Sequence, residues 1–136
     1  MRLWHQSLIP YLPRQQLLGQ HRECCALRGK GWGKPHSVVN YVFTHSPCYL
    51  VAYHKLIMKE MRNRGYNPNE VWENYQYRGT SLGLEDWCSD DKISNLLFEV
   101  RDNNLIIYPE HNNSYLNECI ENLKSKNIII NLKVDK

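Results

Sequence analysis

The strongest constraint on the fold of this chain is residues 46–65, whose sequence SPCYLVAYHKLIMKEMRNRG has the features of a complete helix. Ser46 is a favourable N-cap, Pro47 suits the first helical position, and Gly65 suits the C-terminal end. Mostly apolar side chains recur at helical spacing, namely Leu50, Val51, His54, Ile57, Met58 and Met61. This stripe predicts a buried helical face, so the remaining elements must pack around it.

Two further segments predict amphipathic helices. The first lies between Pro13 and Gly29, because proline suits the start of a helix and glycine suits its end. Its apolar residues fall roughly on one side, and they are Leu17, Leu18, Cys24, Cys25 and Leu27. The second segment is SYLNECIENLKSK, residues 114–126.

The C-terminal part of the chain also predicts a small β component. Residues 92–100 fit a short helix or a strand, and the apolar runs at 104–109 and 127–134 predict strands. We therefore predict a mostly α fold, in which a compact helical domain carries a small C-terminal α/β add-on. The length suits a single domain spanning residues 1–136.

Charge divides the chain into a basic half that we expect to be catalytic and an acidic half. Residues 1–69 contain ten basic and two acidic side chains, whereas residues 70–136 contain seven basic and twelve acidic ones. A basic half with so few carboxylates indicates a polyanionic partner such as nucleic acid. A basic surface that is merely solvated is the alternative.

The predicted DNA contacts come from this basic half. The loop GKGWGKPH, residues 29–36, combines lysines and a tryptophan that could touch a DNA backbone or a base. The alternative for Trp32 is packing against the protein surface. The full predicted set is Arg2, Arg14, Arg22, Arg28, Lys30, Trp32 and Lys34.

Other features bear on the compartment. No stretch is long and apolar enough for a membrane span, and the N-terminal residues lack the pattern of a signal peptide. Five cysteines, two of them adjacent, make a poor disulfide framework and favour reduced thiols. We therefore expect a cytoplasmic protein that does not associate with a membrane.

The stretch HRECC, residues 21–25, permits two interpretations. His21 and Cys24 have the spacing of a metal-ligand pair, which His45 and Cys48 repeat further along the chain. Buried helical cysteines with surface histidines are the commoner arrangement, so we predict no metal and no cofactor. The other interpretation takes Glu23, one of the two acids in the basic half, as an ion-pair partner or as a functional carboxylate.

A resemblance favours the functional carboxylate. The opening MRLW, the stretch RQQLLGQHRE and the segment HSPCYLVAYHKLIMKEMRNRGYNP resemble the pyrimidine-dimer DNA glycosylase family, which includes phage endonuclease V. The likeness covers about residues 1–68, and Arg22–Glu23 occupies the place of the arginine–glutamate pair of the family. The phage enzyme's basic, aromatic C-terminal tail has no counterpart here.

The resemblance implies a DNA repair glycosylase with AP lyase activity. Its nucleophile would be the α-amine of Met1, with Glu23 transferring protons and Arg2 and Arg22 holding phosphates. The implied partner is double-stranded DNA with a damaged or abasic site, and we expect a monomer. A non-catalytic nucleic-acid-binding domain and a small zinc-binding interaction protein are the alternatives.

Overall fold

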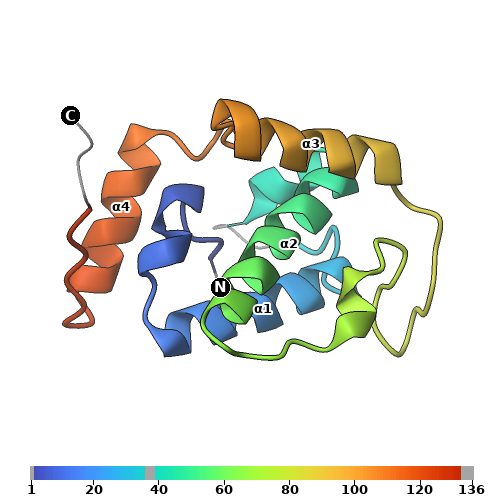
Figure 1. Cartoon of the computed structure of the whole chain (residues 1–136), viewed down its shortest axis with the longest axis horizontal. Helices are drawn as coiled ribbons and strands as arrows, with labels where there is room; N and C mark the ends of the chain where they lie inside the picture. Colours follow the sequence, from blue (N-terminus) through green and yellow to red (C-terminus); the bar gives the residue numbers. More distant parts are fainter. Residues whose placement is uncertain (1, 36–38, 133–136) are drawn as a thin grey trace.

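The computed structural model describes residues 2–35 and 39–132. Its elements occur in the order η1 (Gln6–Tyr11), α1 (Arg14–Arg28), η2 (Asn40–Thr44), α2 (Pro47–Asn63), η3 (Glu70–Glu73), α3 (Asp90–Asn103) and α4 (Asn113–Lys124), where η denotes a 3-10 helix. Figure 1 shows α2 in the middle of the molecule, with α1 and α3 on opposite sides of it and α4 at one end. The prediction of a mostly helical protein is confirmed.

The central helix α2 forms as its sequence predicts. Ser46 accepts a hydrogen bond from the Cys48 amide at 3.2 Å, and Pro47 occupies the first turn. All six residues of the predicted stripe are buried. Because both α1 and α3 pack against α2, the buried face of α2 organises the core.

The helix α1 carries the residues of the candidate site. Leu17, Cys24 and Leu27 are buried along one side, which fixes the rotation of α1 on α2. Glu23 is half-buried and Arg22 is exposed, so the next sides of the helix face away from the core.

The predicted C-terminal α/β add-on is wrong for the described residues. Residues 92–100 belong to α3 and most of 114–126 to α4, whereas 104–109 and 127–132 form no strand. Residues 133–134 of the second predicted strand lie outside the described residues. Within the described ranges, pairing of the β type is limited to an isolated bridge between Tyr77 and Leu84.

A side chain replaces the missing partner strand. The Gln6 amide donates to the Leu105 carbonyl at 2.9 Å and accepts from the Ile107 amide at 2.8 Å. Backbone groups of this segment are thus satisfied without a strand partner, and Ile107 and Tyr108, at a bend of the chain, are buried. One hydrophobic cluster joins residues from both halves of the sequence, from Leu3 to Leu123. None of the described helices has the length and hydropathy needed to cross a membrane.

Candidate active site

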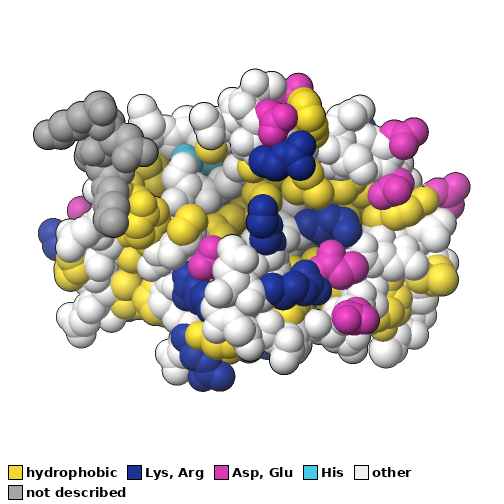
Figure 2. All heavy atoms as spheres, in the orientation of Figure 1, with side chains coloured by type: hydrophobic (Ala, Val, Ile, Leu, Met, Phe, Trp, Pro, Cys, Tyr) yellow, Lys and Arg dark blue, Asp and Glu magenta, His cyan; other side chains and the backbone are white. Residues whose placement is uncertain are grey.

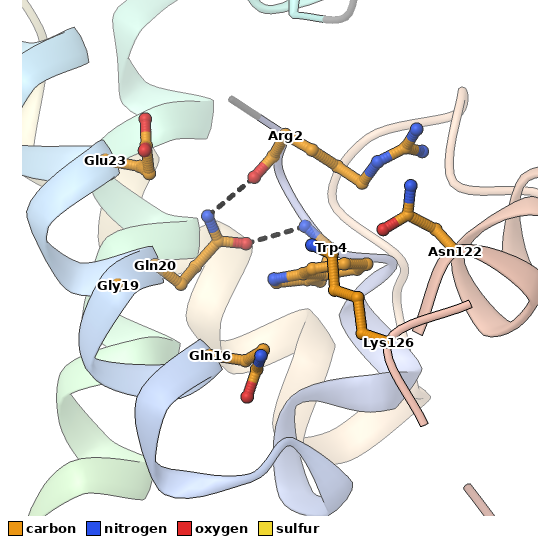
Figure 3. A pocket seen from close by; sticks show the side chains of 8 residues that line it. All are labelled: Arg2, Trp4, Gln16, Gly19, Gln20, Glu23, Asn122 and Lys126. Atoms are coloured by element: carbon orange, nitrogen blue, oxygen red, sulfur yellow. Dashed lines mark hydrogen bonds between the residues drawn. The ribbon is translucent and has the colours of Figure 1, made fainter. Parts of the chain in front are cut away.

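The N-terminal segment is fastened to α1 by one buried glutamine, Gln20. Its Nε2 donates to the Arg2 carbonyl at 2.9 Å, and its Oε1 accepts from the Trp4 amide (Figure 3). The Tyr53 hydroxyl, from α2, lies 2.9 Å from Gln20 Oε1 and 2.6 Å from the Trp4 carbonyl. The backbone of the first described residues is therefore held in a defined position beside α1.

This clamp forms one side of a cavity of about 420 Å³. The cavity is lined by Arg2, Trp4, Gln16, Gly19, Gln20, Glu23, Asn122 and Lys126. Glu23 lies three residues after Gln20, about one helical turn along the same side of α1. The helix thus places a carboxylate near the peptide of Arg2.

One carboxylate oxygen of Glu23 lacks a hydrogen-bond partner in the described part of the chain. Its Oε2 is buried and has no hydrogen-bond partner among the described residues. Ion-paired or well-bonded carboxylates are the rule in buried positions, and exceptions call for an explanation. The ion-pair interpretation of Arg22–Glu23 therefore receives no support from the described contacts, since no salt bridge joins the two residues there.

The predicted nucleophile, Met1, lies outside the described residues. Its neighbour Arg2 lies with its guanidinium carbon 5.9 Å from the Trp4 ring centroid and 5.8 Å from that of Tyr115. Arg2 and Glu23 are thus brought together at one cavity, as their predicted roles require.

The other predicted DNA-binding residues on α1 differ in their surroundings. Arg22 is exposed, and its guanidinium lies beside Gly19. A Cβ atom added at Gly19 would be 3.7 Å from Arg22 Nη2. Because Gly19 lines the cavity, the charge of Arg22 lies at the cavity edge. Arg14 is exposed and lies 5.5 Å from the Tyr66 ring centroid, at the far end of the helix.

The glycine-rich loop contributes exposed cations and a packed aromatic ring. Lys30 and Lys34 are exposed. Trp32 instead contacts Phe43 and Trp87 edge-on, with centroid distances of 5.1 and 5.5 Å. These contacts favour the packing alternative for Trp32 over base stacking.

Arg28 is fully buried, in contrast to its predicted role. Its guanidinium donates to the carbonyls of Trp72, Asn74 and Tyr77 at 2.8 to 3.1 Å. With no exposed surface left for a phosphate, Arg28 cannot contact DNA in this conformation. It instead ties the end of α1 to the irregular segment that follows α2, so we leave it out of the proposed DNA surface.

Arg28 also determines how a buried histidine is protonated. Its Nη1 lies 3.0 Å from His54 Nδ1, and a guanidinium can only donate. Nδ1 must therefore accept, which places the proton of neutral His54 on Nε2. Burial, reinforced by the charge of Arg28, lowers the pKa of His54 well below its usual value, so the ring is neutral.

The same histidine belongs to a group that could in principle hold a metal. The ligand atoms of His21, Cys25 and His54 lie within 4.8 Å of one another. His54 Nε2 lies 2.8 Å from His21 Nδ1 and, carrying the proton, donates to it rather than offering a lone pair. Burial also raises the pKa of Cys25 to about 11, which disfavours the thiolate. These contacts fit a hydrogen-bond chain better than a metal centre.

The metal ligands suggested by the sequence are not assembled. Cys24 is fully buried, whereas Cys25 is the thiol that faces His21. His45 bonds to Glu110 at 2.9 Å, and Cys48 contacts the backbone of Ser89. The two His-x-x-Cys pairs thus face different partners.

Two features of the surface were not predicted from the sequence. One is the wall of the cavity formed by Asn122, in the last turn of α4, and by Lys126, two residues beyond the end of that helix. Only tertiary structure brings that helix to the N-terminus.

The other feature is a groove between α2 and α3, the α2–α3 groove. Figure 2 shows lysine and arginine side chains gathered around a hollow on this face. Those that line the groove are Lys55, Lys59, Arg62 and Arg101. Lys55 and Arg62 are both paired with Glu73, so part of the positive charge is already neutralised. The helical spacing of the α2 cations could have indicated this basic face.

Comparison with known proteins supports the family resemblance found in the sequence. A family model described as pyrimidine dimer DNA glycosylase matches residues 1–74, which is more than half of the chain. The match includes all of α1 and α2 and ends after η3. No curated protein and no solved structure matches the chain significantly.

Proposed function

Because the chain belongs to the pyrimidine dimer DNA glycosylase family, we propose that it excises damaged bases and cleaves the resulting abasic site by AP lyase chemistry. The observation that carries this proposal is the cavity shared by Arg2 and Glu23, in which Gln20 holds the Arg2 carbonyl. The substrate would be double-stranded DNA with a damaged or abasic site.

The proposed nucleophile is the α-amine of Met1. An α-amine has a pKa of about 7.7–8.0, so a useful fraction is neutral at neutral pH, unlike a lysine side chain. The positive charges of Arg2 and Arg22 favour the neutral amine further. The clamp on Arg2 supports this role, since it fixes the peptide that follows the amine.

The amine nitrogen would attack C1′ of the damaged nucleotide, and the bond from C1′ to the base would break. The base leaves with that electron pair and takes up a proton, while the attached amine loses one. Opening of the sugar ring transfers the C1′–O4′ electron pair to O4′, which is protonated, and leaves an imine. Glu23 would then remove a C2′ proton, the 3′ phosphate would leave, and water would hydrolyse the imine.

Glu23 is suited to this task because the residue lines the cavity, and its buried Oε2 has no hydrogen-bond partner among the described residues. No hydrogen bond within the described part of the chain would therefore have to break before the carboxylate accepts a proton. Arg2 and Arg22 at the cavity, with Arg14, Lys30 and Lys34 further along, would hold DNA phosphates.

The test is borohydride trapping on an abasic-site duplex, which reduces the imine to a stable adduct. The native chain should form the adduct, and an N-terminally acetylated form should not. Glu23→Gln should slow the strand cleavage that follows by about 10²–10⁴-fold. Glu70→Gln, an exposed acid on η3, is the matched control and should behave as the native chain.

A non-catalytic DNA-binding domain gives the opposite result. It would bind the duplex but form no adduct, and neither acetylation nor Glu23→Gln would change its binding. An unchanged adduct yield after acetylation would contradict the assignment of the α-amine.

A further inference from the structure

We infer that the α2–α3 groove docks an acidic, amphipathic helix of a partner protein. The inference goes beyond the proposed function and does not depend on it. In Figure 1, α3 and α1 lie on opposite sides of α2, and α1 carries Arg14, Arg22 and Glu23 of the proposed DNA site. The groove therefore lies away from α1, which stays open to DNA when the groove is occupied.

The α2–α3 groove is continued by two smaller hollows. The groove itself, of about 560 Å³, shares Leu56, Lys59 and Val100 with a hollow of about 240 Å³. A further hollow, also of about 240 Å³, extends from Val100 to Asn104. Along α3 and its C-cap the lining residues run from Ser94 to Asn104, which is about 15 Å at about 1.5 Å per residue. A seam of this length between two helices fits a third helix of about ten residues.

The floor of the groove is apolar. Leu56, Leu97 and Val100 are half-buried, and Phe98 is 49% exposed. Figure 2 shows apolar side chains between the cations of this face. Apolar side chains that gather along one seam indicate a binding surface, whereas scattered ones do not. A helix would cover this floor with apolar residues spaced three and four positions apart.

The rim of the groove is positively charged on its α2 side. Lys55 lies 3.3 Å from the Glu73 carboxylate, and Arg62 pairs with the same residue. The ammonium group of Lys59 has no hydrogen-bond or ion-pair partner within residues 2–35 and 39–132. One carboxylate thus faces three cations, which leaves two of them uncompensated. Such a rim favours carboxylates on the partner.

Other contacts favour a protein segment over DNA. The carboxylate of Glu73 lines the groove and would repel a phosphate placed there. Arg101 is bonded to Asp102 at 2.8 Å, and its guanidinium carbon lies 5.3 Å from the Phe98 ring centroid. The ring is thereby partly covered against base stacking, and an apolar floor contributes nothing to a phosphate contact. A helix instead places its apolar residues on the floor and its carboxylates near Lys59.

The experiment uses a display library of random peptides of about 12 residues, long enough to span the groove as a helix. The library is selected on the native chain and counter-selected on Phe98→Asp, an exposed position. Enriched peptides should combine carboxylates with apolar residues at three- and four-residue intervals. The most enriched peptide is then synthesised, and its affinity is measured by fluorescence anisotropy.

Two groove variants should weaken binding of this peptide. Phe98→Asp should weaken it at least about tenfold, because it removes an aromatic anchor. Lys59→Glu should weaken it about tenfold, because it replaces an attractive charge with a repulsive one. Ile129→Asp and Lys124→Glu make the same changes at exposed positions that do not line the groove, and they should stay within about twofold of the native affinity. Urea unfolding would establish that all four variants are folded.

Several outcomes would overturn the inference. One is a selection that enriches no peptide, or only peptides without acidic residues. Displacement of the peptide by an abasic-site duplex would assign the groove to DNA, and dimers of the native chain that Phe98→Asp abolishes would assign it to a second copy. Failure of borohydride trapping, in contrast, would refute the proposed function and leave this inference standing.

Discussion

Replacing Arg28 with methionine should destabilise the protein by about 3 kcal/mol without changing how the folded protein responds to salt when it binds DNA. The guanidinium donates three hydrogen bonds to backbone carbonyls and one to His54. Hydrogen bonds to charged groups contribute about 1.5–3 kcal/mol each, so the three carbonyl contacts amount to roughly 4.5–9 kcal/mol. Burial of the charge costs several kcal/mol, which leaves a net value near 3 kcal/mol.

Arg22→Met is the matched comparison, because it makes the same chemical change at an exposed position of the same helix. Its stability should lie within about 0.5 kcal/mol of the native value. Its salt slope for duplex binding should fall by about one, since one phosphate contact is lost.

Urea unfolding followed by circular dichroism gives the free energies, and fluorescence anisotropy at several salt concentrations gives the slopes. The reasoning would be refuted if Arg28→Met unfolded at the native urea concentration and also reduced the salt slope. That result would mean that Arg28 leaves its buried position to contact DNA.

Three further predictions address other parts of the molecule. Gln20→Leu should reduce borohydride trapping at least tenfold and destabilise by about 2 kcal/mol, because it removes buried hydrogen bonds, whereas the exposed Gln15→Leu should change neither. Burial lowers the pKa of His111 to about 3, while the unfolded ring titrates near 6.5, so the free energy of unfolding should decrease as pH falls from about 6.5 toward 3. Urea unfolding at several pH values measures this, and a His111→Gln variant should show a shallower dependence. Lys59→Ala and Arg101→Ala, in the α2–α3 groove, should leave trapping within about twofold; a larger loss would extend the proposed DNA surface across that face.

The parts of the fold that could be predicted are those encoded locally. The cap, the proline and the periodic stripe of residues 46–65 all specify a helix before any tertiary contact is known. The strand predictions for the apolar residues 104–109 and 127–132 were wrong, because an apolar run does not reveal whether a partner strand exists. At 104–109 the hydrogen bonds go to the side chain of Gln6, about a hundred positions away in the sequence.

Some residues of the candidate site could likewise be predicted from the sequence, and others could not. The proximity of Arg2 and Glu23 was expected from the family resemblance, and the cavity brings them together. The basic charge of Arg28 placed it among the predicted DNA contacts. Arg28 nevertheless follows Cys24 by four positions and so lies on the buried side of the helix. The contribution of Asn122 had no local signal, since it depends on where α4 packs.

The burial of Arg28 has a consequence for the motions of the protein. The segment of residues 74–88 has almost no regular secondary structure, yet a side chain of α1 holds the carbonyls of Asn74 and Tyr77 within it and that of Trp72 just before it. Trp87 reinforces this attachment by donating to the Tyr75 carbonyl and packing under Arg78. Hydrogen exchange should therefore report this irregular stretch and the last turn of α1 as one cooperative unit, opening together rather than fraying separately.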